Sequence, residues 1–353
     1  MSNAYLNHIA TATPEYDIHQ KFTKYALASL DCESDRALLR ALVNRSQIEH
    51  RYSVLESIAK SSLLDENNIY VDGKFPSTKE RMLLYEQNAF SLARKALDQL
   101  DLDEKKEEIT HLIITTCTGF YAPGIDIQII EHYNLNPEIE RTIIGFMGCY
   151  AAINALKLAH HIVNSKKSAN VLIVNIELCT LHLQSTNSVR DLLPFLIFAD
   201  GCAASIISAK KIGIELQSFY STILPNSSEQ ITWHIGDSGF EMALSSLVPK
   251  LIITELPHVI NKILRGKNCE DFVHFAIHPG GKSIIDAVEK GIGLRPKLLI
   301  PSREILRQFG NMSSATIMFV LQKMMRQKNP SGEGCAIAFG PGVTLESMLF
   351  KIL

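Results

Sequence analysis

The segment of residues 145–163, GFMGCYAAINALKLAHHIV, places a cysteine between a glycine-containing turn and a long apolar helical pattern. After Cys149, small and apolar residues fill most positions, so a helix here would be apolar on nearly every side and therefore buried. The preceding residues 141–146, RTIIGF, resemble a strand, and Gly145 and Gly148 allow the tight turn that a strand-to-helix junction needs. The sequence therefore predicts a strand, a turn that carries Cys149, and a central helix.

Apolar runs of strand length alternate with helical patterns along the rest of the chain. The helical patterns are residues 125–133 (IDIQIIEHY), 282–292 (KSIIDAVEKGI) and 310–325 (GNMSSATIMFVLQKMM). The strand-like runs are residues 111–117 (HLIITTC), 169–179 (ANVLIVNIELC), 201–208 (GCAASIIS), 271–281 (DFVHFAIHPGG) and 334–342 (GCAIAFGPG). This alternation predicts stacked α and β layers with a mostly parallel sheet. In each half a strand leads through a glycine-containing turn into a helix, which indicates two similar halves with a boundary near residues 208–215.

The composition argues against several classes of protein. The chain has 353 residues, of which 46% are apolar and 20% charged, and its formal net charge is −2. The net charge therefore gives no overall electrostatic attraction to nucleic acid or to an anionic membrane surface. The first residues lack a secretory signal, and no apolar run approaches the roughly 18 residues of a membrane span. We expect a cytoplasmic protein with neither nucleic acid nor membrane as a partner.

The seven cysteines are widely spaced, and none forms a C-x-x-C pair or a Cys/His cluster with zinc-ligand spacing. We therefore expect free thiols and no metal site. Cys149 could be a small buried side chain or a nucleophile. Its place at a predicted helix N-terminus favours a thiolate, because unpaired backbone N–H groups gather there. The segment alone leaves both interpretations open.

Two further residues add chemistry to the cysteine. His278 ends an apolar strand in FAIHPGG, and Asn311 precedes an apolar helix in FGNMSSAT. Taken singly, His278 fits a core histidine and Asn311 a helix cap. Taken with Cys149, they supply a nucleophile, a base or donor, and a neutral amide donor. Acyl transfer through a thioester needs these three groups.

An ordered set of motifs then makes a family resemblance visible. The sequences GFMGCYAA, HPGG, GNMSSA and FGPG occur in that order, together with TTCTGFYAPGID, ELCTLHLQ, FADGCAAS and WHIGDSGFEM. In this set the chain resembles the type III polyketide synthases, which are chalcone and stilbene synthase-like, over nearly its whole length. The resemblance implies a thiolase fold with two related halves, residues 1–210 and 211–353, stacked as five αβαβα layers. It also implies a homodimer that uses coenzyme A thioesters as substrates, with no bound cofactor and no metal.

The resemblance assigns Cys149, His278 and Asn311 as the catalytic residues. A starter acyl group would pass from coenzyme A to Cys149, which a nearby His278 imidazolium would keep as a thiolate near neutral pH. Malonyl-CoA would then lose carbon dioxide, and His278 and Asn311 would donate hydrogen bonds to the enolate oxygen. The carbanion would attack the cysteine thioester, and the lengthened chain would cyclise to a pyrone-type or resorcinol-type product.

The resemblance also implies a set of substrate contacts. Phe198 matches a gatekeeper phenylalanine, although an ordinary core aromatic remains the alternative; Met242 stands where plant members carry a second gatekeeper phenylalanine. Three residues match positions that line the elongation cavity, namely Cys179, His182 and Ser313. Ala122 matches a residue that reaches across the dimer interface into the partner's cavity. From Ala122, His182 and Met242 we expect medium or long aliphatic starters to be accepted.

Coenzyme A needs cations for its phosphates at the mouth of a tunnel. Arg45 aligns with such a basic residue of the family, and Lys282 and Ser283 follow HPGG close to the expected path of the pantetheine arm. The alternative for both cations is a solvated surface charge.

Three other functions remain open at this point. A fatty-acid initiating 3-oxoacyl synthase, which makes a single condensation, shares the Cys, His and Asn set but usually carries its histidine in an HQAN-like stretch. A degradative thiolase needs a second catalytic cysteine in the C-terminal loop, which here reads FGPG. A papain-like hydrolase does not explain the strand–turn–helix setting of Cys149. The starter, the number of extensions and the mode of cyclisation do not follow from the sequence.

Overall fold

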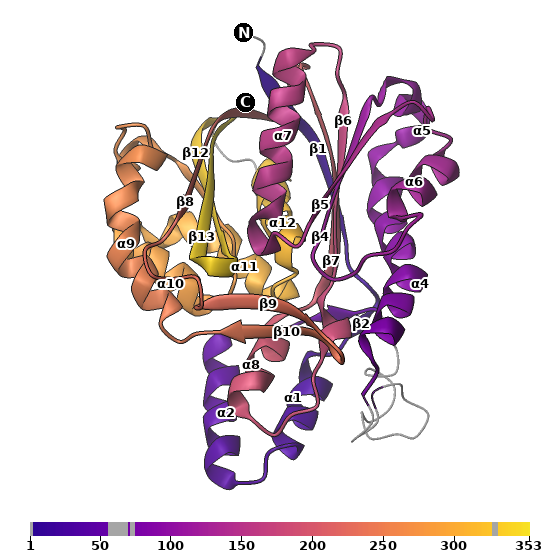
Figure 1. Cartoon of the computed structure of the whole chain (residues 1–353). Coiled ribbons are helices and arrows are strands. Elements are labelled where there is room, and N and C mark those ends of the chain that lie inside the picture. Colours follow the sequence, from indigo (N-terminus) through magenta and orange to yellow (C-terminus); the bar gives the residue numbers. More distant parts are fainter. Residues whose placement is uncertain (1–2, 56–69, 71–74, 327–330) are drawn as a thin grey trace.

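The computed structural model describes residues 3–55, 70, 75–326 and 331–353. In these residues the chain forms one nine-stranded sheet, with helices on its outer faces and in the space between its two halves (Figure 1). Along the sheet the strands follow the order β11-β12-β13-β8-β1-β7-β6-β4-β5.

The N-terminal half of the sheet contains five strands, which are β1 (Ala4–Ala12), β4 (His111–Thr116), β5 (Glu140–Gly145), β6 (Val171–Leu178) and β7 (Asp200–Ser208). The C-terminal half contains four, which are β8 (Ile214–Ile223), β11 (His274–Ile277), β12 (Gly332–Gly340) and β13 (Thr344–Ile352). A short antiparallel ladder between β1 and β8 joins the halves. The expected boundary near residues 208–215 falls in the turn between β7 and β8.

The sheet is mixed, so the expectation of a mostly parallel sheet is wrong. Only β4/β5, β4/β6 and β11/β12 run parallel among the described ladders, and the pairs that include β1, β7, β8 or β13 are antiparallel. A strand covered by helices on both faces reads as a continuous apolar run whichever way its neighbour points. The apolar pattern therefore identified the buried strands but not their directions.

Helices form three layers around the two half-sheets (Figure 1). The outer face of the N-terminal half-sheet is covered by α4 (Thr78–Leu97) and α6 (Ile125–Tyr133), and α5 (Leu102–Lys105) follows α4. The outer face of the C-terminal half-sheet is covered by α9 (Val248–Ile263) and α10 (Lys282–Ile292). Between the half-sheets lie α7 (Ala151–Ser165) and α12 (Thr316–Arg326). The result is the expected five-layered αβαβα order.

The predicted central helix is α7. Its apolar side chains share one core cluster with α12 and with strands of both half-sheets. The small residues Ala152, Ala155 and Ala159 are completely buried, which lets the helix pass close to the strands on both sides.

Among the described residues, no helix is long and apolar enough to cross a membrane.

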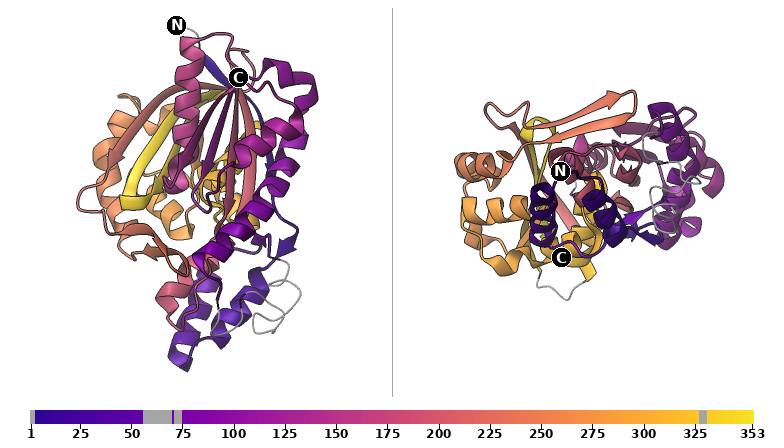
Figure 2. Two further views of the ribbon diagram at one scale, coloured as in Figure 1. Left: turned by 45° about the vertical axis from the view of Figure 1, so that its right-hand side comes forward. Right: turned by 90° about the horizontal axis from the view of Figure 1, so that it is seen from below.

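Smaller elements lie beside and below the sheet. They are α1 (His19–Ala28), α2 (Glu33–Ser46), α8 (Val189–Ile197) and α11 (Ile300–Phe309), with β2 (Tyr16–Asp17) paired to β3 (Tyr52–Ser53). A separate two-stranded hairpin, β9 (Ile231–Gly236) and β10 (Gly239–Leu244), runs along one side of the molecule (Figure 2, right). Short 3₁₀ turns are η1 (Asp98–Leu100), η2 (Lys106–Glu108), η3 (Gly148–Tyr150), η4 (Cys179–His182), η5 (Cys269–Asp271), η6 (Pro296–Leu299), η7 (Ser313–Ala315) and η8 (Pro341–Val343).

Candidate active site

Cys149 is the middle residue of the 3₁₀ turn η3 (Gly148–Tyr150). This turn ends directly before α7 begins at Ala151. Gly148 has φ +80°, and a Cβ there would lie 2.3 Å from the ring of Pro341, so only glycine fits. A Cβ on Gly340 would lie 2.6 Å from the ring of Tyr150. The FGPG sequence at the end of β12 therefore packs closely against the turn and fixes the backbone around Cys149.

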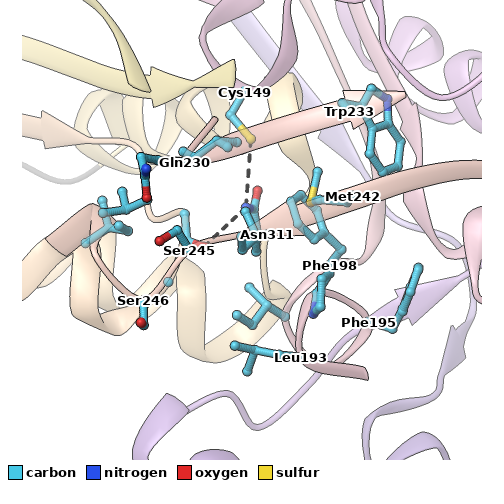
Figure 3. A pocket seen from close by; sticks show the side chains of 18 of the residues that line it. Cys149, Leu193, Phe195, Phe198, Gln230, Trp233, Met242, Ser245, Ser246 and Asn311 are labelled. Carbon is cyan, nitrogen blue, oxygen red and sulfur yellow. Dashed lines mark hydrogen bonds between the residues drawn. The ribbon is translucent and has the colours of Figure 1, made fainter. Parts of the chain in front are cut away.

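The side-chain amide of Asn311 points its nitrogen towards Cys149. The backbone N–H of Ser313 donates a hydrogen bond of 2.9 Å to Asn311 Oδ1. Because that donor is fixed, the oxygen faces the backbone and the NH₂ group faces the cavity. Nδ2 lies 3.9 Å from Cys149 Sγ and donates a 3.4 Å hydrogen bond to the carbonyl of Gly280 (Figure 3).

The backbone of Asn311 is tied to the segment that carries Phe198. Asn311 N–H donates to the carbonyl of Ile197 at 2.9 Å, and Ala199 N–H donates to the carbonyl of Asn311 at 2.8 Å. The two segments thus form an isolated parallel bridge between Phe198 and Asn311. The predicted gatekeeper and the predicted amide donor are neighbours on one rigid support.

His278 follows the last residue of β11, and its backbone N–H donates to the carbonyl of Ile337 at 2.8 Å. The side chain is 1% exposed, and neither ring nitrogen has a hydrogen-bond partner within the described part of the chain. Burial lowers the pKa of His278 to about 3. The imidazole is therefore neutral at physiological pH, and both of its nitrogens are free to contact a bound molecule.

Burial of both side chains opposes the expected thiolate–imidazolium pair. Burial raises the pKa of Cys149 to about 11, against the lowering effect of hydrogen bonds from Ser313 and Asn311. The buried carboxyl of Glu177 raises this pKa further. With these pKa values, Cys149 is a thiol and His278 is a neutral imidazole that lines the same cavity.

All three residues line one cavity of about 1490 Å³. The predicted contact residues Phe198, Cys179, Met242, Ser313 and Ser283 line it too. Figure 3 shows Phe198 and Met242 next to Asn311, and Trp233 farther to the right, on the strand that pairs with that of Met242. Side chains of α2, of α8 and of the start of α9 also line this cavity. The structure thus gathers the core of the predicted site around Cys149.

Four of the predicted residues do not line this cavity. His182 is completely buried behind the wall, where the resemblance had placed it on the surface of the cavity. Ala122 is exposed in the loop between β4 and α6. Lys282 Nζ pairs with Asp286 Oδ2 at 2.5 Å, and Arg45 is exposed on α2. The sequence order of such residues does not reveal which way their side chains point.

A buried carboxyl beside the site was missed in the sequence. Glu177, at the end of β6, accepts hydrogen bonds from Cys117 N–H at 2.9 Å, Thr118 Oγ1 at 3.0 Å and Ser314 Oγ at 2.5 Å. Burial raises the pKa of Glu177 to about 7. The detectable signal was one acidic residue within the otherwise apolar strand VLIVNIEL.

Cys117 connects this carboxyl to the catalytic turn. Its Sγ accepts a hydrogen bond of 3.0 Å from Gly148 N–H, next to Cys149. Burial raises the pKa of Cys117 well above its ordinary value. No group of three or more His, Cys, Asp or Glu among the described residues has a geometry that could hold a metal ion.

Comparisons with known proteins give one consistent result. Models of the N-terminal and C-terminal domains of chalcone and stilbene synthases match residues 1–211 and 215–353. The alpha-pyrone synthesis polyketide synthase-like protein Pks18 of Mycobacterium tuberculosis is 32% identical over 368 aligned positions, which cover 99% of this chain and 91% of Pks18.

Solved structures agree on the fold. Polyketide synthase PKS-I from the brown alga Ectocarpus siliculosus has a TM-score of 0.89 and 25% identity, with coverage of 100% of this chain and 99% of that one. The C-terminal type III polyketide synthase domain of Steely1 from Dictyostelium has a TM-score of 0.90 and 24% identity, with 99% of both chains covered. The alternative of an initiating 3-oxoacyl synthase is not favoured. The chain belongs to the chalcone and stilbene synthase family of type III polyketide synthases, acyltransferases that condense acyl-CoA starters with malonyl-CoA by decarboxylation.

Proposed function

We propose that Cys149, His278 and Asn311 together load an acyl-CoA starter and extend it with malonyl-CoA. One observation carries this proposal: the NH₂ group of Asn311, which also donates to the carbonyl of Gly280, faces Cys149 Sγ at 3.9 Å inside the cavity that His278 also lines. Two neutral donors beside a thiol suit a thioester whose oxygen gains negative charge.

Loading begins from the thiol and the neutral imidazole. As Cys149 sulfur attacks the starter's carbonyl carbon, His278 accepts the thiol proton. The new S–C bond forms, the bond from the acyl carbon to the coenzyme A sulfur breaks, and the proton passes to that sulfur. In the neutral imidazole one ring nitrogen carries no proton, and that nitrogen is the position that accepts the thiol proton.

Extension uses the same residues as donors. The bond between the malonyl carboxylate and its α-carbon breaks, carbon dioxide leaves, and the electron pair forms an enolate on the thioester oxygen. Asn311 Nδ2 and the N–H of His278 donate hydrogen bonds to that oxygen. The α-carbon then attacks the Cys149 thioester, the cysteine sulfur leaves, and the chain on coenzyme A is one ketide unit longer.

We propose medium or long aliphatic starters and a pyrone-type or resorcinol-type product. The support is the cavity volume of about 1490 Å³ and the flexible Met242 in its wall. The similarity to an alpha-pyrone synthesis protein favours the pyrone. Ala122 and His182, which also motivated this expectation, do not line the cavity of their own chain.

We place the coenzyme A nucleotide near the rim, where Ser283 lines the cavity and Leu38 and Leu42 of α2 contribute apolar side chains. Arg45 follows Leu38 by seven residues and Leu42 by three, so it shares their face of the helix. Lys282 precedes Ser283 directly. These positions support phosphate contacts by Arg45 and Lys282.

We propose a homodimer that forms at the outer edge of β5. This strand pairs only with β4 among the described ladders, and Ile143 on it is 48% exposed. The exposed Phe120 and Met147 flank it, and Ala122 lies in the adjoining loop. Sedimentation of wild-type and Ile143→Lys proteins tests this: the wild type should be a dimer and the variant a monomer, and a variant that stays dimeric refutes this edge.

We also propose a cytoplasmic location. All seven cysteines are free, which supports this location, because a reducing compartment keeps thiols unpaired.

The reaction itself is tested with the purified protein. Malonyl-CoA is incubated with acetyl-, hexanoyl-, decanoyl-, palmitoyl- and coumaroyl-CoA, and products are identified by mass spectrometry. We expect pyrones or resorcinols from the aliphatic starters in the middle and long range. Turnover of the aromatic ester alone refutes the proposed starter class, and single-condensation products alone refute iterative extension.

A further inference from the structure

The β9–β10 hairpin forms part of the cavity wall, although it is not part of the main sheet. Trp233 and Met242 on its two strands line the cavity (Figure 3). Its two strands pair only with each other within the described ladders. The position of this wall therefore depends on contacts outside the sheet ladders. At the hairpin turn, Thr78 N–H donates to the carbonyl of Asp237 at 2.8 Å and Gly239 N–H donates to Thr78 Oγ1 at 2.8 Å; the cavity-lining part is held by side chains.

Two of these contacts reach the peptide that follows β4. Trp233 Nε1–H donates a 2.9 Å hydrogen bond to the carbonyl of Cys117. The second contact is made by His182, which connects Thr118 to the hairpin. Its Nε2 lies 2.7 Å from the carbonyl of Thr118, and its Nδ1 accepts a hydrogen bond of 3.0 Å from the backbone N–H of Phe240 in the hairpin. Both anchoring residues, Cys117 and Thr118, themselves line the cavity.

The partners of His182 fix its tautomer. The backbone N–H of Phe240 can only donate, so Nδ1 carries no proton, and the carbonyl of Thr118 can only accept, so Nε2 does. Burial lowers the pKa of His182 to about 3, which keeps this neutral form over the physiological range. The ring also stacks on Phe240, with centroids 4.1 Å apart and planes 11° apart.

The 3₁₀ turn η4, which carries His182, is itself held in place by Arg81. Arg81 is completely buried and donates hydrogen bonds of 2.6 Å and 2.7 Å to the carbonyls of Leu181 and Leu183. Gly239, in the hairpin turn, has φ +104°, and a Cβ there would lie 2.7 Å from Arg81 Nε. His182 is therefore a fixed point to which the hairpin attaches, and it cannot follow the hairpin if the hairpin moves.

We propose that His182 is a positioning residue that holds the β9–β10 hairpin in place and thereby sets the length of acyl and ketide chain that the cavity accepts. It acts through Phe240 N–H and never touches the substrate. Movement of the hairpin would displace Trp233 and Met242 together and change the cavity volume. The link to chain length rests on the proposed function, whereas the link to the hairpin position does not.

Two conservative variants separate the two hydrogen bonds of His182. Asn places an amide oxygen at the bond distance of Nδ1 from Cβ, so His182→Asn keeps an acceptor for Phe240 N–H. Gln places its amide nitrogen at the distance of Nε2, so His182→Gln keeps the donor to Thr118 but loses the acceptor for the hairpin. Only the second variant should release the wall, since a buried N–H would then lack its partner.

The hairpin position has its own probe, because Trp233 is the single tryptophan of the chain. For His182→Gln we expect a red-shifted emission maximum and a rise of about fivefold in the open-to-closed ratio that acrylamide quenching reports, corresponding to one lost hydrogen bond. The ring of His182 also contacts the Trp233 ring, with centroids 5.5 Å apart, and both variants lose this contact. His182→Asn is therefore the reference for the emission of His182→Gln, and we expect wild-type acrylamide quenching for His182→Asn. Thr254→Ala, which removes a 3.0 Å hydrogen bond from an exposed hydroxyl to the carbonyl of Lys250 on α9, is the control and should also behave as wild type.

Products provide the second readout. With one aliphatic starter, His182→Gln should shift the distribution by at least one malonyl unit, and His182→Asn should not. Circular dichroism and the melting temperature show whether each variant is folded. A folded His182→Gln with the emission and quenching of His182→Asn overturns the proposal, whatever its activity. Altered emission with an unchanged product distribution overturns the link to chain length, and a wild-type protein without polyketide products overturns the proposed function instead.

Discussion

The Cys149 turn and the β9–β10 hairpin line the same cavity but are held in different ways. The turn is fixed by its own chain and by close packing: Gly148 and Gly340 leave no space for a side chain, and α7 begins directly after it. The hairpin is attached through an indole, an imidazole and a few polar groups. The backbone around the nucleophile is therefore held by close packing, whereas the hairpin wall depends on single hydrogen bonds that one substitution can remove.

The largest effect is expected for a substitution in the Cys149 turn. Cys149→Ala should abolish product, because no other cysteine of the cavity combines a helix start with the Asn311 amide. The fold should remain, since alanine is smaller than cysteine. Intact-protein mass spectrometry after incubation with decanoyl-CoA should show one acyl group on the wild type and none on the variant. Acylation at Cys117 or Cys179 would contradict this assignment.

Asn311→Ala should reduce malonyl-CoA decarboxylation by roughly 10²–10³, the usual effect of losing one donor to a developing oxyanion. Loading of the starter should fall less. The alanine also removes the acceptor for Ser313 N–H, so Asn311→Asp serves as the control. It keeps the oxygen and replaces only the donor, and it should lose decarboxylation as well. Near wild-type release of carbon dioxide from both variants would reduce Asn311 to a structural cap.

The protonation states provide a third test of the Cys149 turn. With its pKa raised to about 11, Cys149 is almost entirely a thiol at pH 7. Because the thiolate is the reactive form, its alkylation by iodoacetamide should accelerate about tenfold per pH unit up to pH 10. Peptide mass spectrometry follows Cys149, with the exposed Cys32 as the internal reference for the reagent. A plateau from pH 6 upward would instead show a thiolate–imidazolium pair.

The rim should respond less than the catalytic turn. Arg45→Ala and Lys282→Ala should raise KM for acyl-CoA by about tenfold or less, because phosphate contacts at an exposed rim are weakened by solvent. N-acetylcysteamine thioesters, which lack the nucleotide, should be unaffected. Kinetics with both substrate types on each variant decide the matter. Equal losses for both substrates would mean that these residues support the fold or the chemistry.

The sequence was most informative where a constraint falls on the backbone or on one helix face. The strand 111–117 and the helix 125–133 appear as β4 and α6, and the turn around Cys149 follows the glycines that it requires. Strand directions did not follow, since burial on both faces gives the same apolar run either way. The neutral state of Cys149 and His278 depends on desolvation by residues from many segments.

His182 shows why the wall was harder to predict than the turn. The motif ELCTLHLQ identified the correct 3₁₀ turn, η4, but not the direction of its side chains. Cys179 faces the cavity, while His182, three residues later, faces the hairpin. Its partner is Phe240, 58 residues away, and that contact exists only in the folded chain. Glu177 was missed for the same reason, since its hydrogen-bond partners come from two separate segments, residues 117–118 and Ser314.

The smallest effect is expected for Met242, on strand β10 of the hairpin. Met242→Phe adds a rigid ring to the cavity wall and should shift the preference for starters towards shorter chains. Each methylene that can no longer be buried forfeits about 0.8 kcal/mol, or roughly a fourfold change in kcat/KM. The measurement compares kcat/KM for hexanoyl-, decanoyl- and palmitoyl-CoA. Leu83→Phe, at an exposed position on α4 outside the cavity, is the control. Unchanged ratios among the three starters for Met242→Phe would mean that the acyl chain does not pass the hairpin, and the wall that His182 holds would then act on the growing ketide alone.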